Sequence, residues 1–211
     1  MLTRDIQQKL VTFAPWLLII FHVIGLVIML TPDRVLGLSG INMLVCSVLV
    51  LLSAEAVKNE LKLLSFIYVG GMLVEIIGVG SGLLFGSYEY GAELGFQIMG
   101  VPLVLGLNWY CIVVASSNIA KHFIKTKSVL FSAIFAAAAC TFLDFFIEPV
   151  AIANDFWYWE GGAIPTFNYV CWFVFSFVFS FVYLKNSQKI NNTAIALFFI
   201  WFIFFTILNV V

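Results

Sequence analysis

Seven long runs of apolar residues follow one another along the chain, separated by short polar segments. Each run has about 20 residues, the length that a helix needs to cross the hydrocarbon core of a bilayer. The runs are continuously apolar rather than alternating, which argues against a transmembrane β-barrel. The pattern predicts an all-α polytopic membrane protein with about seven transmembrane helices, forming a single transmembrane domain over residues 1–211. The predicted helices cover residues 13–31, 36–54, 61–84, 100–119, 128–149, 166–184 and 193–211.

Composition supports lipid as the solvent of this chain. Hydrophobic residues make up 63% of the sequence and charged residues 10%, whereas soluble domains carry about 25% charged residues. The first apolar run follows Arg4 and Lys9, as a secretory signal would, but it ends without a small-residue cleavage site. We therefore expect it to be a retained first helix.

The distribution of basic residues predicts the orientation. With seven helices, all but one of the ten Lys and Arg residues fall on the same side, and Arg34 alone lies opposite. By the positive-inside rule the N-terminus is cytoplasmic and the C-terminus is outside, in a multi-pass protein of the cytoplasmic membrane. The net charge of -1 gives no reason to expect a nucleic-acid partner.

Two outer loops without Lys or Arg are rich in aromatic residues next to acids, and a weak internal repeat links them. The segment 61–84 contains Glu75 and is followed by Tyr88-Glu89-Tyr90, then by Gly-Val-Pro and, seven residues after the proline, Trp109. The segment 128–149 is followed by Trp157-Tyr158-Trp159-Glu160, then by Ala-Ile-Pro and, again seven residues later, Trp172. Both copies cross in the same direction, so a duplication would be parallel. An interfacial aromatic belt is the simpler interpretation of these loops.

Three carboxylates lie inside predicted helices, where a charge is costly and usually faces the bundle interior. Glu75 shares one helix face with Tyr68 and several glycines, so another helix or a ligand can approach it closely. Asp144 and Glu148 are four residues apart. Two carboxylates one turn apart in a low dielectric cannot both ionise cheaply, so at least one is expected to hold a proton near neutral pH.

Depth brings these acids together with two asparagines. Glu75 lies about nine residues from the outer end of its helix, or roughly 13 Å at 1.5 Å per residue. Asp144, Glu148, Asn108 and Asn168 also fall in the outer half of the bilayer, on consecutive helices. The convergence predicts a functional site, with structural hydrogen bonding between helices as the alternative.

Other candidate chemistries find little support. His22 is the only intramembrane histidine, and the four cysteines lie in four different apolar runs, so both types are interpreted as packing residues and no metal site is predicted. The last helix has no lysine for a retinal Schiff base. The sequence offers no nucleotide-binding loop, and no cofactor is predicted.

Residues 70–172 resemble the membrane carotenoid hydratase family, which adds water to the acyclic end of carotenoids in bacterioruberin- and myxol-type pathways. The resemblance rests on FGSYEY, GVP and WYW in this order, on Asp144, and on the spacing of Pro165, Asn168 and Trp172. Glu148 precedes Pro149 where that family usually has aspartate, which keeps the acid and could mark a different carotenoid substrate.

The resemblance implies a hydro-lyase of isoprenoid metabolism that hydrates the C1–C2 double bond of a γ-carotene- or lycopene-type end group. Acid catalysis would pass through a tertiary carbocation, with the Asp144/Glu148 pair as proton donor and Glu75 polarising the water. Exchange of acid and base between these helices is equally compatible with the sequence. The expected substrate-binding and water-positioning residues are Tyr88, Tyr90, Asn108, Trp109, Trp157, Trp159, Asn168 and Trp172.

Two other functions fit parts of the pattern. Intramembrane acids in a parallel repeat also suit a small proton-coupled transporter, but the sequence shows no matching acids towards the cytoplasmic side. A non-catalytic scaffold for other carotenoid-pathway enzymes is the third interpretation, and it predicts that the carboxylates tolerate substitution.

Overall fold

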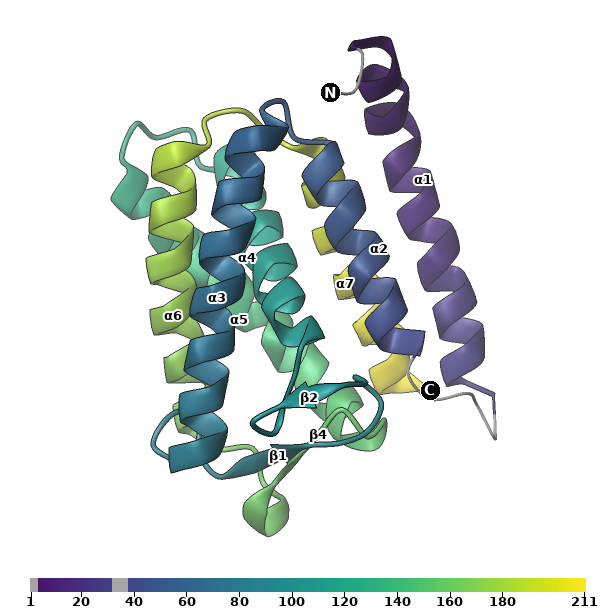
Figure 1. Cartoon of the computed structure of the whole chain (residues 1–211), viewed down its shortest axis with the longest axis vertical. Helices are drawn as coiled ribbons and strands as arrows, with labels where there is room; N and C mark the ends of the chain where they lie inside the picture. Colours follow the sequence, from purple (N-terminus) through teal and green to yellow (C-terminus); the bar gives the residue numbers. More distant parts are fainter. Residues whose placement is uncertain (1–3, 32–37) are drawn as a thin grey trace.

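The computed structural model describes residues 4–31 and 38–211, and within them it has seven α-helices joined into one bundle (Figure 1). Arg34, the one basic residue expected on the outer side, lies outside these ranges. The helices are α1 (Arg4–Met29), α2 (Leu38–Leu52), α3 (Val57–Ser81), α4 (Val104–Phe123), α5 (Val129–Ala153), α6 (Thr166–Asn186) and α7 (Asn192–Val210). The start of α1 and the end of α7 lie at opposite ends of the bundle.

Five of the described helices are long and apolar enough to span a membrane, which supports a multi-pass membrane protein: α1, α3, α5, α6 and α7. The helix α2 is apolar but has only 15 residues. The helix α4 has 20 residues but falls below the hydropathy of a span, since it contains Asn108, Ser116, Ser117 and Asn118. The sequence predicted seven spans of one kind, but α2 is shorter and α4 is more polar than the other five helices.

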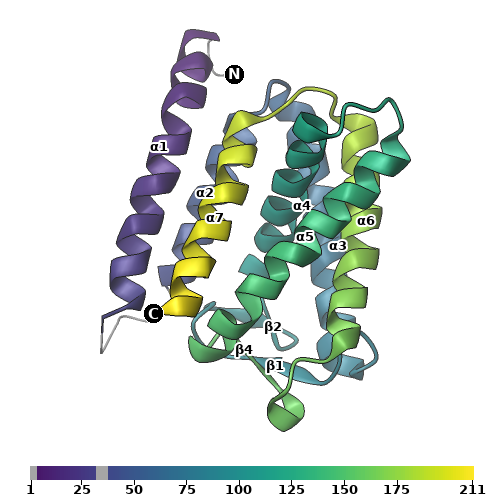
Figure 2. The ribbon, with the colours of Figure 1, turned by 180° about the vertical axis from the view of Figure 1, so that it is seen from behind.

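The polarity of α4 follows from its place at the centre of the bundle. It packs against α2, α3, α5, α6 and α7, and Figure 2 shows it surrounded by them. Most of its residues are buried, including the whole of 109–120. A helix that faces other helices rather than lipid can carry polar side chains, provided that they are hydrogen-bonded.

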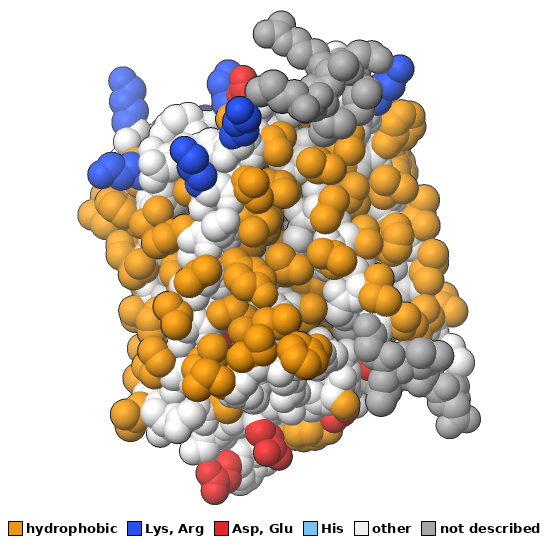
Figure 3. Space-filling view, viewed as in Figure 1, with side chains coloured by type: hydrophobic (Ala, Val, Ile, Leu, Met, Phe, Trp, Pro, Cys, Tyr) orange, Lys and Arg blue, Asp and Glu red, His pale blue; other side chains and the backbone are white. Residues whose placement is uncertain are grey.

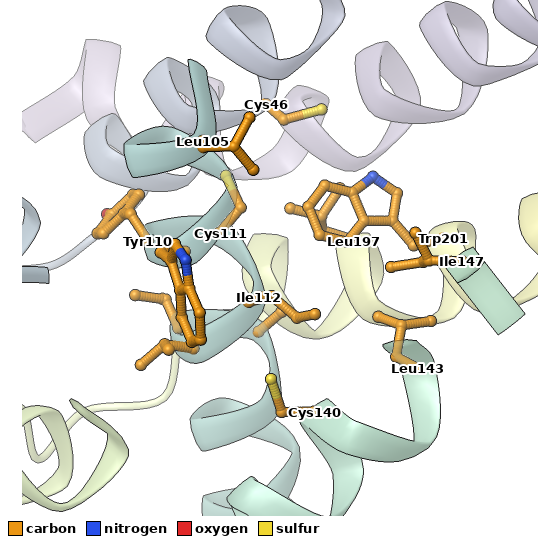
Figure 4. Close-up of a cluster of buried hydrophobic side chains, with 14 of the residues drawn as sticks. Cys46, Leu105, Tyr110, Cys111, Ile112, Cys140, Leu143, Ile147, Leu197 and Trp201 are labelled. Atoms are coloured by element: carbon orange, nitrogen blue, oxygen red, sulfur yellow. The ribbon is translucent and has the colours of Figure 1, made fainter. Parts of the chain in front are cut away.

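The core around α4 is formed by large apolar side chains and small thiols (Figure 4). Ile112 and Cys111 of α4 lie among Leu143 of α5, Leu197 of α7 and Cys46 of α2. All four cysteines are buried and free, in agreement with the prediction that they are packing residues. The thiol of Cys111 lies 3.2 Å from the hydroxyl of Ser47.

Close approach of α3 and α4 depends on two glycines. A Cβ added at Gly71 would lie 2.5 Å from the Trp109 ring, and one at Gly106 would lie 2.5 Å from the Tyr68 ring. The Trp109 ring of α4 therefore packs on Gly71 of α3, and the Tyr68 ring of α3 packs on Gly106 of α4. The small face predicted on residues 61–84 is the surface on which α4 packs.

The two aromatic loops contain strands that the all-α prediction did not include. The strand β1 (Tyr88–Tyr90) pairs antiparallel with β4 (Trp157–Trp159), and β2 (Gln97–Ile98) pairs antiparallel with β3 (Val101–Pro102). A short 3₁₀ turn, Glu160–Gly162, follows β4. The strands form because backbone groups near the bilayer need partners, and aromatic residues favour extended chains. The hairpin β2–β3 also delays the start of α4, which was expected at residue 100.

Charge divides the surface into two ends with an apolar belt between them. Figure 3 shows Lys and Arg side chains gathered at the end of the bundle opposite the strands, with an acidic side chain among them, and further acidic side chains at the strand end. Large exposed side chains such as Phe13, Phe66 and Phe145 cover the surface between the two ends. This is the surface expected of a helical bundle surrounded by lipid.

Candidate active site

The pairing of β1 with β4 places the two aromatic loops side by side over the buried acids. Side chains alternate along a strand, so Tyr88 and Tyr90 point towards the bundle while Glu89 points away. On β4, Trp157 and Trp159 are buried and Tyr158 is exposed. Tyr88 lies opposite Trp159, and Tyr90 lies opposite Trp157. We refer to the paired strands β1 and β4 as the ribbon. Its inner face thus presents the phenol rings of two tyrosines and the indole rings of two tryptophans.

The β1 tyrosines and one tryptophan of α4 donate hydrogen bonds to Glu75. Its Oε2 accepts from the hydroxyls of Tyr88 (2.6 Å) and Tyr90 (2.7 Å), and its Oε1 accepts from Nε1 of Trp109 (2.8 Å). Glu75 is 3% exposed, so these donors replace water around the carboxylate. Burial and the Glu75 carboxylate raise the pKa of both tyrosine hydroxyls above the ordinary value of 10.0, so both remain donors.

The β4 tryptophans and one asparagine of α6 donate in the same way to Glu148. Its Oε2 accepts from Nε1 of Trp157 (3.0 Å) and of Trp159 (2.9 Å), and its Oε1 accepts from Nδ2 of Asn168 (2.8 Å). The same amide nitrogen lies 3.2 Å from Oδ2 of Asp144. Oδ1 of Asp144 is buried and has no partner among the described residues. Asn168 therefore links the two acids of α5.

Glu75 and Glu148 face each other across a small cavity. Its volume is about 20 Å³, which is room for one water molecule. The wall consists of the two carboxylates, the inner face of the ribbon, and side chains of the neighbouring elements. These other residues are Phe85, Leu105, Asn108, Asn168 and Trp172. We refer to this space as the carboxylate cavity.

Asn108 differs from the other polar residues of the carboxylate cavity, because its side chain hydrogen-bonds to none of the residues that the structure describes. It is half-buried on α4 and lines the cavity with both its donor and its acceptor available. A carboxamide in this state can hold a water molecule by one group and leave the other for a second ligand.

The two copies of the predicted repeat meet at the centre of the site. Trp109 and Trp172 stack with ring centroids 4.3 Å apart and planes 17° from parallel. Glu75 and Glu148 each accept from two aromatic residues of the strand that follows their own helix. This arrangement has the approximate two-fold relation expected of a parallel repeat, since antiparallel strands are exchanged by a two-fold axis.

The structure brings the predicted site residues together, with two differences in position. Nine of them line the carboxylate cavity: Glu75, Tyr88, Tyr90, Asn108, Glu148, Trp157, Trp159, Asn168 and Trp172. Trp109 lies behind Glu75 as a hydrogen-bond donor. Asp144 is fully buried behind Asn168 and does not reach the cavity wall. It was expected to share in proton donation, but it can influence the cavity only indirectly, since Asn168 donates to both Asp144 and Glu148.

Sequence reasoning did not identify four other residues near buried polar groups. Phe85 and Leu105 line the carboxylate cavity, and Glu93 is 3% exposed beside Ser39, whose hydroxyl donates to it over 2.7 Å. Glu60 accepts from the Tyr110 hydroxyl over 3.0 Å at the opposite end of α3. Glu93 is an acid without adjacent aromatics, and Glu60 immediately precedes the predicted helix 61–84, so neither stood out in the sequence.

Glu60 corrects the statement that no acid is buried on the side predicted to be cytoplasmic. The helix α3 begins at Val57 rather than 61, and Glu60 in its first turn is 3% exposed. Tyr110 donates a hydrogen bond to Glu60 inside the bundle, which reduces the cost of burying the carboxylate. The clustering of acids in one half is therefore not an argument against transport.

His22 is a hydrogen-bonded packing residue, as expected. Its Nδ1 lies 2.7 Å from the Leu18 carbonyl and must donate to it, so Nε2 is an acceptor. Nε1 of Trp201 donates to Nε2 over 2.9 Å. The imidazole thus has its proton on Nδ1 and joins α1 to α7.

The stacked tryptophans offer a test of the hydrogen bond to Glu75. Trp109→Phe removes the donor, whereas Trp172→Phe changes the same ring stack and removes no hydrogen bond to a described residue. We expect Trp109→Phe to be less stable than Trp172→Phe by about 1–3 kcal/mol, because a buried carboxylate loses a donor. Thermal denaturation in detergent measures the difference. Equal midpoints would show that the bond does not contribute to stability.

Comparison with known proteins places this chain in a family. The chain matches the carotenoid biosynthesis protein family over residues 16–211. A bisanhydrobacterioruberin hydratase of Haloarcula japonica is 26% identical over 112 residues, which are 47% of this chain and 36% of that protein. The chain therefore aligns with about a third of that relative's length. No solved structure matches the chain. Because the family match covers nearly all of the sequence, the chain belongs to the carotenoid biosynthesis protein family.

Proposed function

We propose that this protein is a carotenoid 1,2-hydratase, which adds water across the C1–C2 double bond of an acyclic end group of the γ-carotene or lycopene type. The observation that carries the proposal is the carboxylate cavity, which has room for one water between Glu75 and Glu148. Addition of water to a trisubstituted alkene needs one acid, one base and one positioned water. The hydratase name of the Haloarcula japonica relative supports the same reaction.

In the proposed reaction Glu148 gives a proton to C2 of the alkene, and the positive charge develops at the tertiary carbon C1. The oxygen of the bound water forms a bond to C1, and one of its protons passes to Glu75. The product is the 1-hydroxy end group, with no change in total electrons. Glu75 then holds a proton and Glu148 lacks one, and a new water between them can return it. Both carboxylates line the same cavity, as this exchange requires.

The surroundings of the two carboxylates support this division of work. Glu75 and Glu148 each accept three hydrogen bonds, but Glu75 has no second acid four residues away, so it suits the ionised base. Glu148 shares the Asn168 amide with Asp144, and one proton on that pair lowers the repulsion between them. Asp144 is then a positioning residue, because its negative charge favours the protonated form of Glu148.

Aromatic faces and amides complete the proposed chemistry. The ring of Trp157 lies on the cavity wall, where it can stabilise a carbocation in the absence of bulk water. Asn108 holds the water by its free carboxamide. None of these steps calls for a cofactor or a metal.

The proposed topology places the carboxylate cavity in the outer half of the cytoplasmic membrane, with the chain acting as a single transmembrane unit. The Lys- and Arg-rich end would be cytoplasmic and the strand end outside (Figure 3). A substrate dissolved in the bilayer would then reach the site without crossing either aqueous phase.

The experiment that tests the function is expression in a host that accumulates lycopene or γ-carotene. The expected result is a more polar pigment whose mass exceeds that of the substrate by one water. Chromatography and mass measurement of the extracted pigments check it. Unchanged pigments in cells whose membranes contain the folded protein would contradict the proposal.

One observation supports the transport alternative and another opposes it. Glu60 gives α3 a second buried acid at the other end of the bundle, which a proton-coupled carrier would use. Membership of a carotenoid biosynthesis family favours chemistry on the polyene instead. A scaffold for other pathway enzymes is separated from the hydratase by substitution of the carboxylates, which only an enzyme requires.

A further inference from the structure

A second and larger cavity adjoins the carboxylate cavity. Its volume is about 100 Å³, and its wall comes from α1, α2, α4, α5, α7 and the outer loops. Apolar side chains such as Met29, Leu94, Ile147 and Phe204 form most of this wall. We refer to it as the apolar cavity.

The two cavities share three wall residues: Leu105, Asn108 and Trp157. Asn108 is the polar member of the three, and its carboxamide has no partner among the described residues. A group in the apolar cavity and a water in the carboxylate cavity can therefore both contact the Asn108 side chain. The shared wall is the place where an alkene and a water would meet.

Size assigns different contents to the two cavities. The carboxylate cavity, at about 20 Å³, holds a water but not a branched hydrocarbon end. An apolar cavity of about 150 Å³ binds benzene in another protein, so one of about 100 Å³ suits a single branched isoprene unit. The remainder of a polyene must then extend out of the bundle into lipid.

The helix α1 forms the side of the apolar cavity from which such a chain can enter. It packs against α2 and α7 at the edge of the bundle, and only 17% of its apolar segment is buried (Figures 1 and 2). On its inner side Gly25 leaves space next to Phe204 of α7, which an added Cβ would approach to 3.8 Å. The bond from Trp201 to His22 joins the two helices about one turn before Gly25, so it lies beside the space at Gly25 and does not fill it.

We propose that the apolar cavity is the binding site for the branched end of the acyclic carotenoid, which enters from the bilayer between α1 and α7. The terminal double bond lies against Asn108, within reach of the water and acids of the carboxylate cavity. The polyene passes Gly25 and Phe204 to the lipid. This inference rests on the proposed function and assigns the substrate a place that the carboxylates alone do not define.

The test fills the entrance without touching the carboxylates. Gly25→Phe places a ring at the entrance, and Gly80→Phe is the matched control, because Gly80 faces outward on α3 with nothing within 4 Å of an added Cβ. Both are made in a Glu75→Gln background, so that binding is measured without turnover. The readout is the ratio of lycopene to protein after purification in detergent.

We expect Gly25→Phe to lower the bound lycopene at least about tenfold, while Gly80→Phe leaves it within about twofold of the background protein. Phe204→Ala added to Gly25→Phe restores the space and is expected to restore binding. Equal lycopene retention by Gly25→Phe and Gly80→Phe would overturn the inference. Ile28→Trp, one turn further along the same wall, replaces Gly25→Phe if that variant does not accumulate in the membrane.

The same variants with Glu75 intact separate this inference from the proposed function. Product formation should fall in Gly25→Phe and persist in Gly80→Phe. If substitution of the carboxylates leaves turnover unchanged, the hydratase mechanism fails, and the retention measurement still decides where the pigment binds. If the carboxylates are required but Gly25→Phe turns over normally, the mechanism stands and the proposed entrance is wrong.

Discussion

Glu75→Gln is expected to lower the rate of hydration about a hundredfold to ten-thousandfold, the range for removing a general acid or base. Glutamine keeps the size of the side chain and can still accept from Trp109 or from the tyrosines. It cannot take the proton that water releases when its oxygen bonds to C1. The loss should therefore appear in kcat rather than in pigment retention. Product formed per unit of membrane protein, measured in time courses by chromatography, gives the ratio.

Glu89→Gln is the matched control for Glu75→Gln. Glu89 lies between the two tyrosines that donate to Glu75, but it is exposed and points away from the cavity. The same change of charge on β1, outside the cavity, should leave the rate within about twofold of the wild type. A Glu75→Gln protein as active as Glu89→Gln would rule out Glu75 as the base and would favour the scaffold interpretation.

Glu148→Gln is expected to cause a loss of similar size, and the two acids of α5 should not be equivalent. Glu148 lines the carboxylate cavity, where it is the proposed proton donor. The amide of the substituted glutamine has no proton acidic enough to give to C2. Asp144 lies behind it, and Asp144→Asn should cost less, roughly tenfold to a hundredfold, because the donor remains in place. Glu148→Asp retains an acid and should keep more activity than Glu148→Gln. The measurement is again the initial rate of product formation.

The order of the initial rates of Glu148→Gln, Glu148→Asp and Asp144→Asn tests the role of Glu148. Glu160→Gln, in the turn that follows β4, is the control for a lost charge near the site, since Glu160 is exposed. If Asp144→Asn were more damaging than Glu148→Gln, the proton donor would be Asp144 and the assignment of roles on α5 would be wrong. If Glu148→Asp were as inactive as Glu148→Gln, an acid at this position would not suffice and the exact reach of its carboxyl would matter.

Much of the site could be predicted because the membrane makes polar residues conspicuous. A carboxylate in an apolar run needs a partner, so Glu75, Asp144 and Glu148 indicate a buried polar centre without any knowledge of the fold. The repeat of acid, aromatic loop, proline and tryptophan indicated that the two halves share this centre. Stacking of Trp109 on Trp172 and pairing of β1 with β4 are the contacts through which they do so.

The apolar runs and the charge asymmetry in the sequence were enough to predict a helical membrane protein and the approximate positions of its helices, because lipid requires a continuous apolar run of bilayer length. The environment of each run was decided only by packing. The centre of the bundle tolerates the polar residues of α4, and Tyr110 allows Glu60 to be buried. Strand pairing decided that the aromatic side chains of the outer loops point inward to the acids. The two cavities that meet at Asn108 depend on contacts among residues far apart in the chain, and no local pattern encodes such contacts.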